Sequence, residues 1–168
     1  MGKYSETYRT LANFGAELLQ KRSLEDGLPL ISNYAKDVIK AERCSIFIVD
    51  HEANSLWSTL SDGVKKIIIP VDKGLVGLTL KEKNPIVEND PYSNSAFLPD
   101  VDKRTGFRTD NVITSPIFSS KREVMGVLQL LNKEKGFDKD DAKFMVFFSH
   151  YISGFLELTN IFHKYDQD

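Results

Sequence analysis

The sequence predicts an α+β domain in which helices cover one face of an antiparallel sheet. Near both ends of the chain, apolar residues recur at alternating steps of four and three, the spacing of a stripe along a helix. Between the ends, the pattern changes to short runs rich in β-branched and aromatic residues, separated by turn signals. Helices, then strands, then a helix is the order of an α+β fold. The 168 residues, 41% of them hydrophobic, suffice for one domain with a sizeable core.

Three helical patterns lie outside the central strands. The first falls within residues 1–22, with an apolar stripe of Tyr4, Tyr8, Leu11, Gly15 and Leu18. The second carries Leu28, Ile31, Ala35 and Val38. Ser23 and Asp26 are both candidates for its N-cap, and Pro29 favours Asp26 because proline is tolerated only in the first turn. The third falls within residues 138–165, with a stripe of Phe144, Phe148, Tyr151, Phe155, Leu158 and Phe162.

Five runs are expected to form strands: CSIFIVD (44–50), SLWSTL (55–60), KIIIP (66–70), VITSPIF (112–118) and VMGVLQLLN (124–132). The short polar turns HEAN, SDG and SSKRE join neighbouring runs, which favours antiparallel pairing. After the third run, a turn leads into a short helix that begins near Leu75. This helix is expected to stop before Pro85, since the residue preceding a proline disfavours helical backbone.

Residues 88–111, the lid segment, show no regular periodicity, and about 24 residues is long for a connection inside a compact domain. A disordered linker would lack large apolar side chains, whereas this segment holds Tyr92, Phe97, Leu98, Val101 and Phe107. We therefore expect an ordered lid on the sheet face that the terminal helices leave free, closing a pocket over the strands. A lid packed on a solid core is the alternative, and the pattern leaves both open.

Three polar residues of the lid segment recur at steps of three and four: Asp102, Thr105 and Thr109. One helical turn would place them on a common side. On the inner face of a lid they would need partners, because an unsatisfied buried donor or acceptor costs about 1–3 kcal/mol. A polar ligand is one possible partner. Solvent exposure with capping roles is the alternative for each of them.

Composition and charge exclude several classes of function. The net charge of −2 and the interspersed basic residues give no footprint for nucleic acid. The single cysteine, Cys44, forms no internal disulfide, and no apolar run has the length of a membrane span or the form of a signal peptide, so we expect a cytoplasmic location. His51, His150 and His163 lack metal-ligand spacing, and no catalytic triad stands out. We expect no metal, no cofactor and no enzymatic activity.

Four motifs occur in a recognisable order: ERCSIFIVD, IIIPVDKGLVG, the lid segment with VDKRTGFRTDN, and VMGVLQLLNK. Together they resemble the GAF domain family, in the branch found in cyclic-nucleotide phosphodiesterases and cyanobacterial adenylyl cyclases. The resemblance implies a single GAF domain over residues 1–168. Its fold would be the PAS-related, six-stranded antiparallel sheet, with the terminal helices packed on one face and a ligand cavity under a lid on the other.

The resemblance also implies a set of ligand-binding positions: Ser45, Asp62, Leu75, Val76, Asp102, Thr105, Thr109 and Gln129. Leu75 and Val76 begin a helix, whose free N–H groups and dipole suit the single charge of a cyclic phosphate. Ser45 and Gln129 alternate with apolar neighbours, and we expect both to point inward. Asp62 would contact the purine, with an ordinary role in the SDG turn as the equal alternative. Ser61 stands where a stacking aromatic residue can occur, which leaves the choice between cAMP and cGMP open.

A second family signature fits Asn132, Lys133, Phe137 and Asp141, although Ala142 replaces its final glutamate. In the family the lysine and aspartate pair to hold the last strand to the helix, which implies a structural role here. The function implied by the resemblance is that of a sensory module in a larger signalling protein, fused to effector domains. It would bind cAMP or cGMP and relay lid closure through the terminal helices at 1–22 and 138–165, which we expect to form a homodimer. A sensor for another metabolite and a ligand-free dimerisation spacer are the alternatives.

Overall fold

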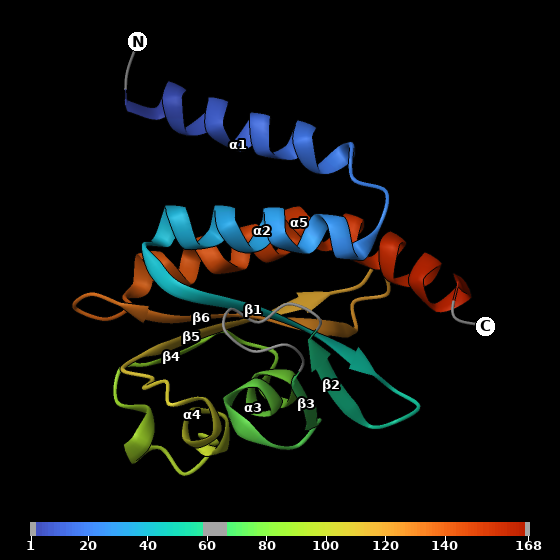
Figure 1. Cartoon of the computed structure of the whole chain (residues 1–168). Coiled ribbons are helices and arrows are strands. Elements are labelled where there is room, and N and C mark those ends of the chain that lie inside the picture. Colours follow the sequence, from blue (N-terminus) through green and yellow to red (C-terminus); the bar gives the residue numbers. More distant parts are fainter. Residues whose placement is uncertain (1–2, 59–66, 167–168) are drawn as a thin grey trace.

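The computed structural model describes residues 3–58 and 67–166 of the chain (Figure 1). In chain order, its elements are α1 (Lys3–Leu19), α2 (Leu24–Ile39), β1 (Ala41–Asp50), β2 (Ser55–Ser58), β3 (Ile67–Pro70), α3 (Gly74–Glu82), β4 (Ile86–Glu88), the 3₁₀ turn η1 (Pro91–Ser93), α4 (Asp100–Thr105), β5 (Val112–Phe118), β6 (Val124–Lys133) and α5 (Lys139–Asp166).

One antiparallel sheet organises the domain. Its six strands lie in the order β3-β2-β1-β6-β5-β4, so the two longest strands, β1 and β6, pair at the centre. Figure 1 shows α1, α2 and α5 on one side of the sheet and α3 and α4 on the other. The predicted α+β fold is therefore confirmed, and the lid segment lies on the face that the terminal helices leave free.

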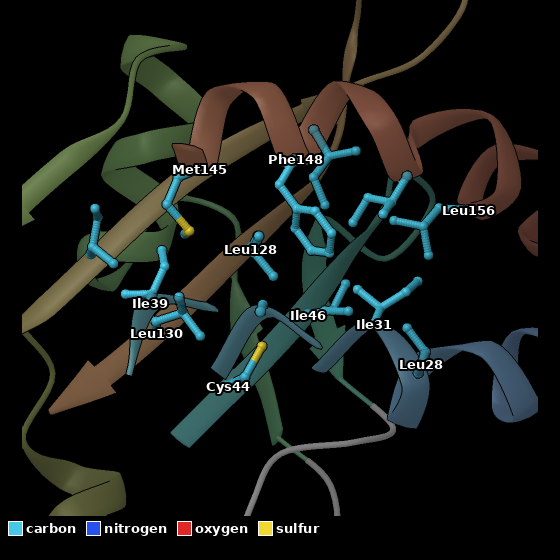
Figure 2. Close-up of a cluster of buried hydrophobic side chains, with 14 of the residues drawn as sticks. Leu28, Ile31, Ile39, Cys44, Ile46, Leu128, Leu130, Met145, Phe148 and Leu156 are labelled. Atoms are coloured by element: carbon cyan, nitrogen blue, oxygen red, sulfur yellow. The ribbon is translucent and has the colours of Figure 1, made fainter. Parts of the chain in front are cut away.

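The main core lies between the sheet and the helices α2 and α5. Alternate residues of β1 point toward these helices, namely Cys44, Ile46 and Ile48, and they pack with Leu128 and Leu130 of β6. Figure 2 shows Cys44, Ile46, Leu128 and Leu130 facing Phe148 and Met145 of α5 and Ile31 of α2. All of these side chains are buried.

The helix α1 forms an outer layer on α2, further from the sheet than α2 and α5 are (Figure 1). Phe14 of α1 stacks on Tyr34 of α2 with ring centroids 4.3 Å apart, and both rings pack against Phe148 of α5. Burial raises the pKa of the Tyr34 phenol, as does the nearby Tyr151. A single aromatic cluster therefore joins the three helices.

The predicted N-cap of the second helix was wrong. Ser23, not Asp26, caps α2, because its hydroxyl accepts the backbone N–H of Asp26 at 3.1 Å while its own backbone is extended. Pro29 is the sixth residue of the helix, so it lies beyond the first turn that we took as its limit. The buried face of Leu24, Leu28, Ile31 and Ala35 packs on the core and outweighs the missing N–H.

Candidate ligand-binding site

Three polar residues lie side by side on the sheet face opposite α2 and α5. Ser45 of β1 is in register with Gln129 of β6, which is in register with Thr114 of β5. Residues in register point to the same face. Phe47 and Val127 lie two positions further along this face and pack with Val76 of α3, which identifies it as the face toward the lid. Ser45 and Gln129 are therefore directed inward, as expected.

Thr114, which sequence reasoning missed, fixes α3 to the sheet. The Thr79 hydroxyl donates to the Leu75 carbonyl at 2.8 Å, and its oxygen lies 2.5 Å from the Thr114 hydroxyl. A hydroxyl carries a single hydrogen, so Thr114 is the donor to Thr79. Both threonines are fully buried. The alternation in VITSPIF, which places Thr114 on the same face as Pro116, was the signal that could have found it.

The predicted phosphate-binding residues Leu75 and Val76 are the second and third residues of α3, and both side chains are buried. Lys73 is the N-cap and provides no side-chain hydrogen bond to the first turn. The first N–H groups of a helix have no acceptor within it, so this turn can offer them to an anion. Gly77 allows the helix start to approach the preceding loop, because a Cβ there would lie 2.8 Å from the Val71 carbonyl oxygen.

The carboxylate of Asp102 is a hydrogen-bonding centre within the lid segment. It accepts the Tyr92 hydroxyl at 2.5 Å, the Thr109 backbone N–H at 2.9 Å and the Thr109 hydroxyl at 3.0 Å. Asp102 is 8% exposed and Thr109 is 1% exposed. The burial of these two residues therefore requires no ligand, since Tyr92 and Thr109 supply the partners for which a ligand was one candidate.

The expected geometry of this polar set also differs from the structure. The helix α4 ends at Thr105, and Gly106 follows in the left-handed conformation at φ +74°. Thr109 lies beyond the helix, so no single helical turn carries the three residues. Asp102 and Thr109 still meet because the chain reverses at Gly106. The side chain of Thr105 is not among those described, so its role stays a prediction.

Two cation–π contacts hold the aromatic residues of the lid segment. The Arg43 guanidinium of β1 lies 3.5 Å from the centroid of the Phe107 ring, and Arg108 lies 4.8 Å from that of Tyr92. The hydrogen bond to Asp102 raises the pKa of the Tyr92 phenol, because the neutral phenol is the donor. Tyr92 and Phe107 thus have structural partners in the lid, which explains aromatic residues in an irregular segment.

The second family signature forms the junction between β6 and α5. Lys133 pairs with both carboxylate oxygens of Asp141 at 2.7 and 2.8 Å, so the expected ion pair is present. Phe137 is buried. Asn132 takes the left-handed conformation at φ 63°, and its side chain binds the backbone of the lid segment at Arg108 and Asp110. This junction therefore contacts the lid, a role that the signature alone did not reveal.

Asp62 and Ser61 lie outside the described residues, so the purine contact assigned to Asp62 stays a prediction. A hollow of about 490 Å³ lies between α3 and residues 95–98, but Ser45, Gln129, Asp102 and Thr109 do not line it.

Within residues 3–58 and 67–166, no group of three or more His, Cys, Asp or Glu side chains could hold a metal ion. In the same residues, none of the helices combines the length and the apolar character needed to cross a bilayer.

A family model described as GAF domain matches residues 23–155, from the cap of α2 to the middle of α5. The chain belongs to the GAF family. Among curated proteins, this GAF domain is 26% identical to a probable 3′,5′-cyclic phosphodiesterase pde-5 from Caenorhabditis elegans, over 149 residues that make up 80% of the chain and 20% of that protein. It is 27% identical to the dual 3′,5′-cyclic-AMP and -GMP phosphodiesterase 11A from Takifugu rubripes, over 63% of the chain and 14% of that protein.

These relatives agree with the predicted phosphodiesterase-associated branch, and the GAF domain spans a fifth or less of their length. Among solved structures, the GAF domain of an Acinetobacter phosphoenolpyruvate-protein phosphotransferase has a TM-score of 0.79 at 23% identity. That match covers 96% of this chain and 97% of the other. At this identity the likeness establishes the fold, and it carries no ligand or activity with it.

Proposed function

We propose that this GAF domain is a regulatory module that binds a cyclic nucleotide, cAMP or cGMP, between the sheet and the lid segment. The observation that carries the proposal is the pair of Ser45 and Gln129, which are adjacent on the sheet face directed toward α3 and lie next to the apolar side chains of Phe47 and Val127. A pocket with apolar walls and few convergent polar groups is the usual form of a small-molecule site. The matched relatives are cyclic-nucleotide phosphodiesterases by name, which favours this class of ligand.

In this proposal each part of the site has a chemical role. Ser45 and Gln129 offer hydroxyl and amide groups to the edge of the purine. The first turn of α3, at Leu75 and Val76, offers N–H groups and a positive dipole end to the cyclic phosphate, an effect of about 0.3–1 kcal/mol when exposed and up to about 2 kcal/mol when partly buried. Asp62 completes the purine contacts.

The lid segment would act as the responding element. A ligand shifts a conformational equilibrium only by its differential affinity for the two states. The hydrogen bonds among Tyr92, Asp102 and Thr109 hold the lid together without a ligand. A bound nucleotide would add contacts to the closed lid rather than supply missing ones, and Thr105 is the remaining candidate for such a contact.

Calorimetry with cAMP and cGMP, with 5′-AMP as the comparison, tests the proposal. We expect a dissociation constant in the micromolar range, about −8 kcal/mol of binding free energy. Gln129→Ala should weaken binding at least tenfold, while Gln20→Ala, a change of the same side chain at an exposed position, should not. Absence of heat and of a thermal shift at millimolar cAMP and cGMP would refute nucleotide binding. Denaturing mass spectrometry of the natively purified protein would then identify another metabolite or an empty spacer domain.

We also propose that the domain forms a homodimer through α1 and α5 and belongs to a longer protein with effector domains. Large apolar side chains are exposed along these helices: Tyr8, Leu19, Phe147, Tyr151, Leu158 and Ile161. A hollow of about 930 Å³ between the helices is lined mainly by small and apolar residues, among them Ala12, Gly15, Ala16 and Leu158. Leu19, Tyr151 and Leu158 are exposed and also line this hollow, and an exposed apolar patch of this kind indicates an interaction site.

Sedimentation analysis of the full chain tests the dimer. We expect a dimer at micromolar concentration that Leu158→Glu converts to a monomer. Ile68→Glu, which places the same charge on an equally exposed apolar residue of β3, should leave the dimer intact. A monomeric parent chain at high concentration would refute the proposal.

A further inference from the structure

The start of the lid segment is bound to the turn before α5 by a single side chain. Asn89 follows β4, and its amide nitrogen donates to the Phe137 carbonyl at 3.1 Å while its amide oxygen accepts the Phe137 N–H at 2.9 Å. An amide is the side-chain group that carries a donor and an acceptor in the arrangement of a peptide unit. Asn89 therefore pairs with Phe137 as a neighbouring strand would.

Gly136 makes room for this contact. It adopts φ +87°, and a Cβ at this position would lie 2.7 Å from the amide oxygen of Asn89 and 3.0 Å from its Cγ. The glycine thus serves both a left-handed turn and the close approach of the Asn89 side chain. Gly136 is therefore required by the contact with Asn89 of the lid segment as well as by the conformation of the turn.

The end of the lid segment is bound to the same region in the same manner. Asn111, 8% exposed, donates to the Lys133 carbonyl at 3.0 Å and accepts the Lys133 N–H at 2.8 Å. In the opposite direction, Asn132 donates to the Arg108 carbonyl at 2.9 Å and accepts the Asp110 N–H at 2.7 Å. We call the residues Asn89, Asn111 and Asn132 the asparagine clasp.

The asparagine clasp contacts the end of β6 at Lys133 and the turn at Phe137, just before α5. Asp138 and Asp141 cap this helix reciprocally, since each carboxylate accepts the backbone N–H of the other at 2.9 Å. Asp141 also pairs with Lys133, whose backbone binds Asn111. Hydrogen bonds and the Lys133–Asp141 ion pair, joined by the backbone at Phe137 and Asp138 and by the Lys133 residue, therefore connect both ends of the lid segment to the first turn of α5.

We infer that the asparagine clasp couples the lid segment to α5, so that loosening the lid loosens the first turns of that helix. The inference deepens the proposed relay and rests on it for its biological meaning, but the coupling itself needs no ligand. Physical continuity alone does not establish coupling, which requires that a change at one end alters the other. The structure provides a change confined to the lid: Tyr92→Phe removes the hydroxyl that donates to Asp102.

Hydrogen exchange of the full chain without nucleotide, followed by mass spectrometry, measures the coupling. In the parent chain, we expect Tyr92→Phe to accelerate exchange in residues 97–107 and, by about fivefold or more, in residues 139–146, the size of a typical coupling. In an Asn89→Ala/Asn111→Ala background, the same change should still accelerate residues 97–107 but leave residues 139–146 unaffected. Unchanged exchange in β6 residues 126–130 verifies that the fold persists.

Asn84→Ala is the matched control, because Asn84 is exposed and its amide donates to the nearby Glu82 carbonyl. Transmission from Tyr92→Phe to residues 139–146 should persist in that background. If the double variant does not fold, Asn89→Asp, which keeps the shape and loses the donor, replaces it. Equal acceleration of residues 139–146 with and without the Asn89 and Asn111 side chains, or no acceleration in the parent chain, overturns the inference. Calorimetric failure to bind cAMP or cGMP is a separate result and leaves this one standing.

Discussion

Asp102 and Thr109 lie on opposite sides of the left-handed Gly106, and the carboxylate of Asp102 accepts both the backbone N–H and the hydroxyl of Thr109. The contact closes the second half of the lid segment into a loop that Tyr92 joins from the first half. The lid segment therefore has an internal scaffold of hydrogen bonds.

Asp102→Ala should destabilise the domain by about 2–3 kcal/mol. The substitution removes three hydrogen bonds to a charged acceptor and leaves the buried Thr109 hydroxyl without its partner. Urea unfolding followed by circular dichroism measures the change. Asp37→Ala, at an exposed position of α2, should shift the unfolding free energy by no more than about 0.5 kcal/mol. Equal effects of the two substitutions would show that the scaffold contributes nothing.

Gly77→Ala should destabilise the domain by about 1–3 kcal/mol, as overpacking does. The added Cβ would lie 2.8 Å from the Val71 carbonyl oxygen and 3.0 Å from the Asp72 carbonyl carbon, and backbone atoms cannot move away as a flexible side chain can. Gly154→Ala in α5 is the opposite case, because nothing lies within 4 Å of its Cβ position. That substitution should stabilise the helix by about 0.5–1 kcal/mol. Thermal unfolding of both variants should give shifts of opposite sign.

Local patterns in the sequence and the family signature were enough to predict part of the structure. The GLVG turn and the stripe of α5 are local patterns, and they were enough to predict the helix start near Leu75 and the last helix. The ion pair of Lys133 and Asp141 was expected because the family signature carries tertiary information. The helices on one face of the sheet and the lid segment on the other were predicted from the local patterns and the family resemblance.

The missed features are long-range contacts of ordinary residues. Asn89 binds a residue 48 positions away, and Thr79 meets Thr114 at a separation of 35, so neither pairing leaves a local signal. Tyr92 was treated as an apolar lid residue, although its hydroxyl satisfies Asp102. Asp26 was preferred to Ser23 as a cap because a local rule on proline was given more weight than the buried face of α2.

The stability of the domain should fall in acid partly through Asp138. Its carboxylate accepts the backbone N–H of Asp141 at the start of α5, and this hydrogen bond lowers the pKa of the Asp138 carboxyl. A lowered folded-state pKa gives stability that is fully present above the unfolded value of about 3.9 and is lost as the pH falls through the folded value. Urea midpoints between pH 6 and pH 3 should therefore decline less steeply for Asp138→Asn, which caps the helix without titrating. Identical slopes would contradict this assignment.

Glu157, in the second half of α5, should also make the stability of the domain depend on pH. Its carboxylate accepts the hydroxyl of Ser120 at 2.7 Å and the Ser120 backbone N–H at 2.8 Å, and these bonds lower the pKa of the Glu157 carboxyl. As for Asp138, the lowered pKa of the Glu157 carboxyl means that its contribution to stability is lost as the pH falls. Glu157→Gln should therefore flatten the same pH profile. Identical pH profiles for Glu157→Gln and the parent chain would contradict this assignment.

Lys133→Met should destabilise the domain by about 1–3 kcal/mol, more than a surface ion pair is worth. The Lys133 and Asp141 side chains are 24% and 10% exposed, so removal of the cation leaves a mostly buried carboxylate with fewer partners. Asp141 still accepts the Asp138 N–H, which should limit the loss. A double-mutant cycle with Asp141→Asn isolates the interaction energy between Lys133 and Asp141. Lys143→Met, at an exposed position of α5, measures the effect of a lysine-to-methionine change where no such pair is removed. A coupling energy near zero would mean that the hydrogen bonds between Asn111 and the Lys133 backbone, and not the ion pair, hold β6 to α5.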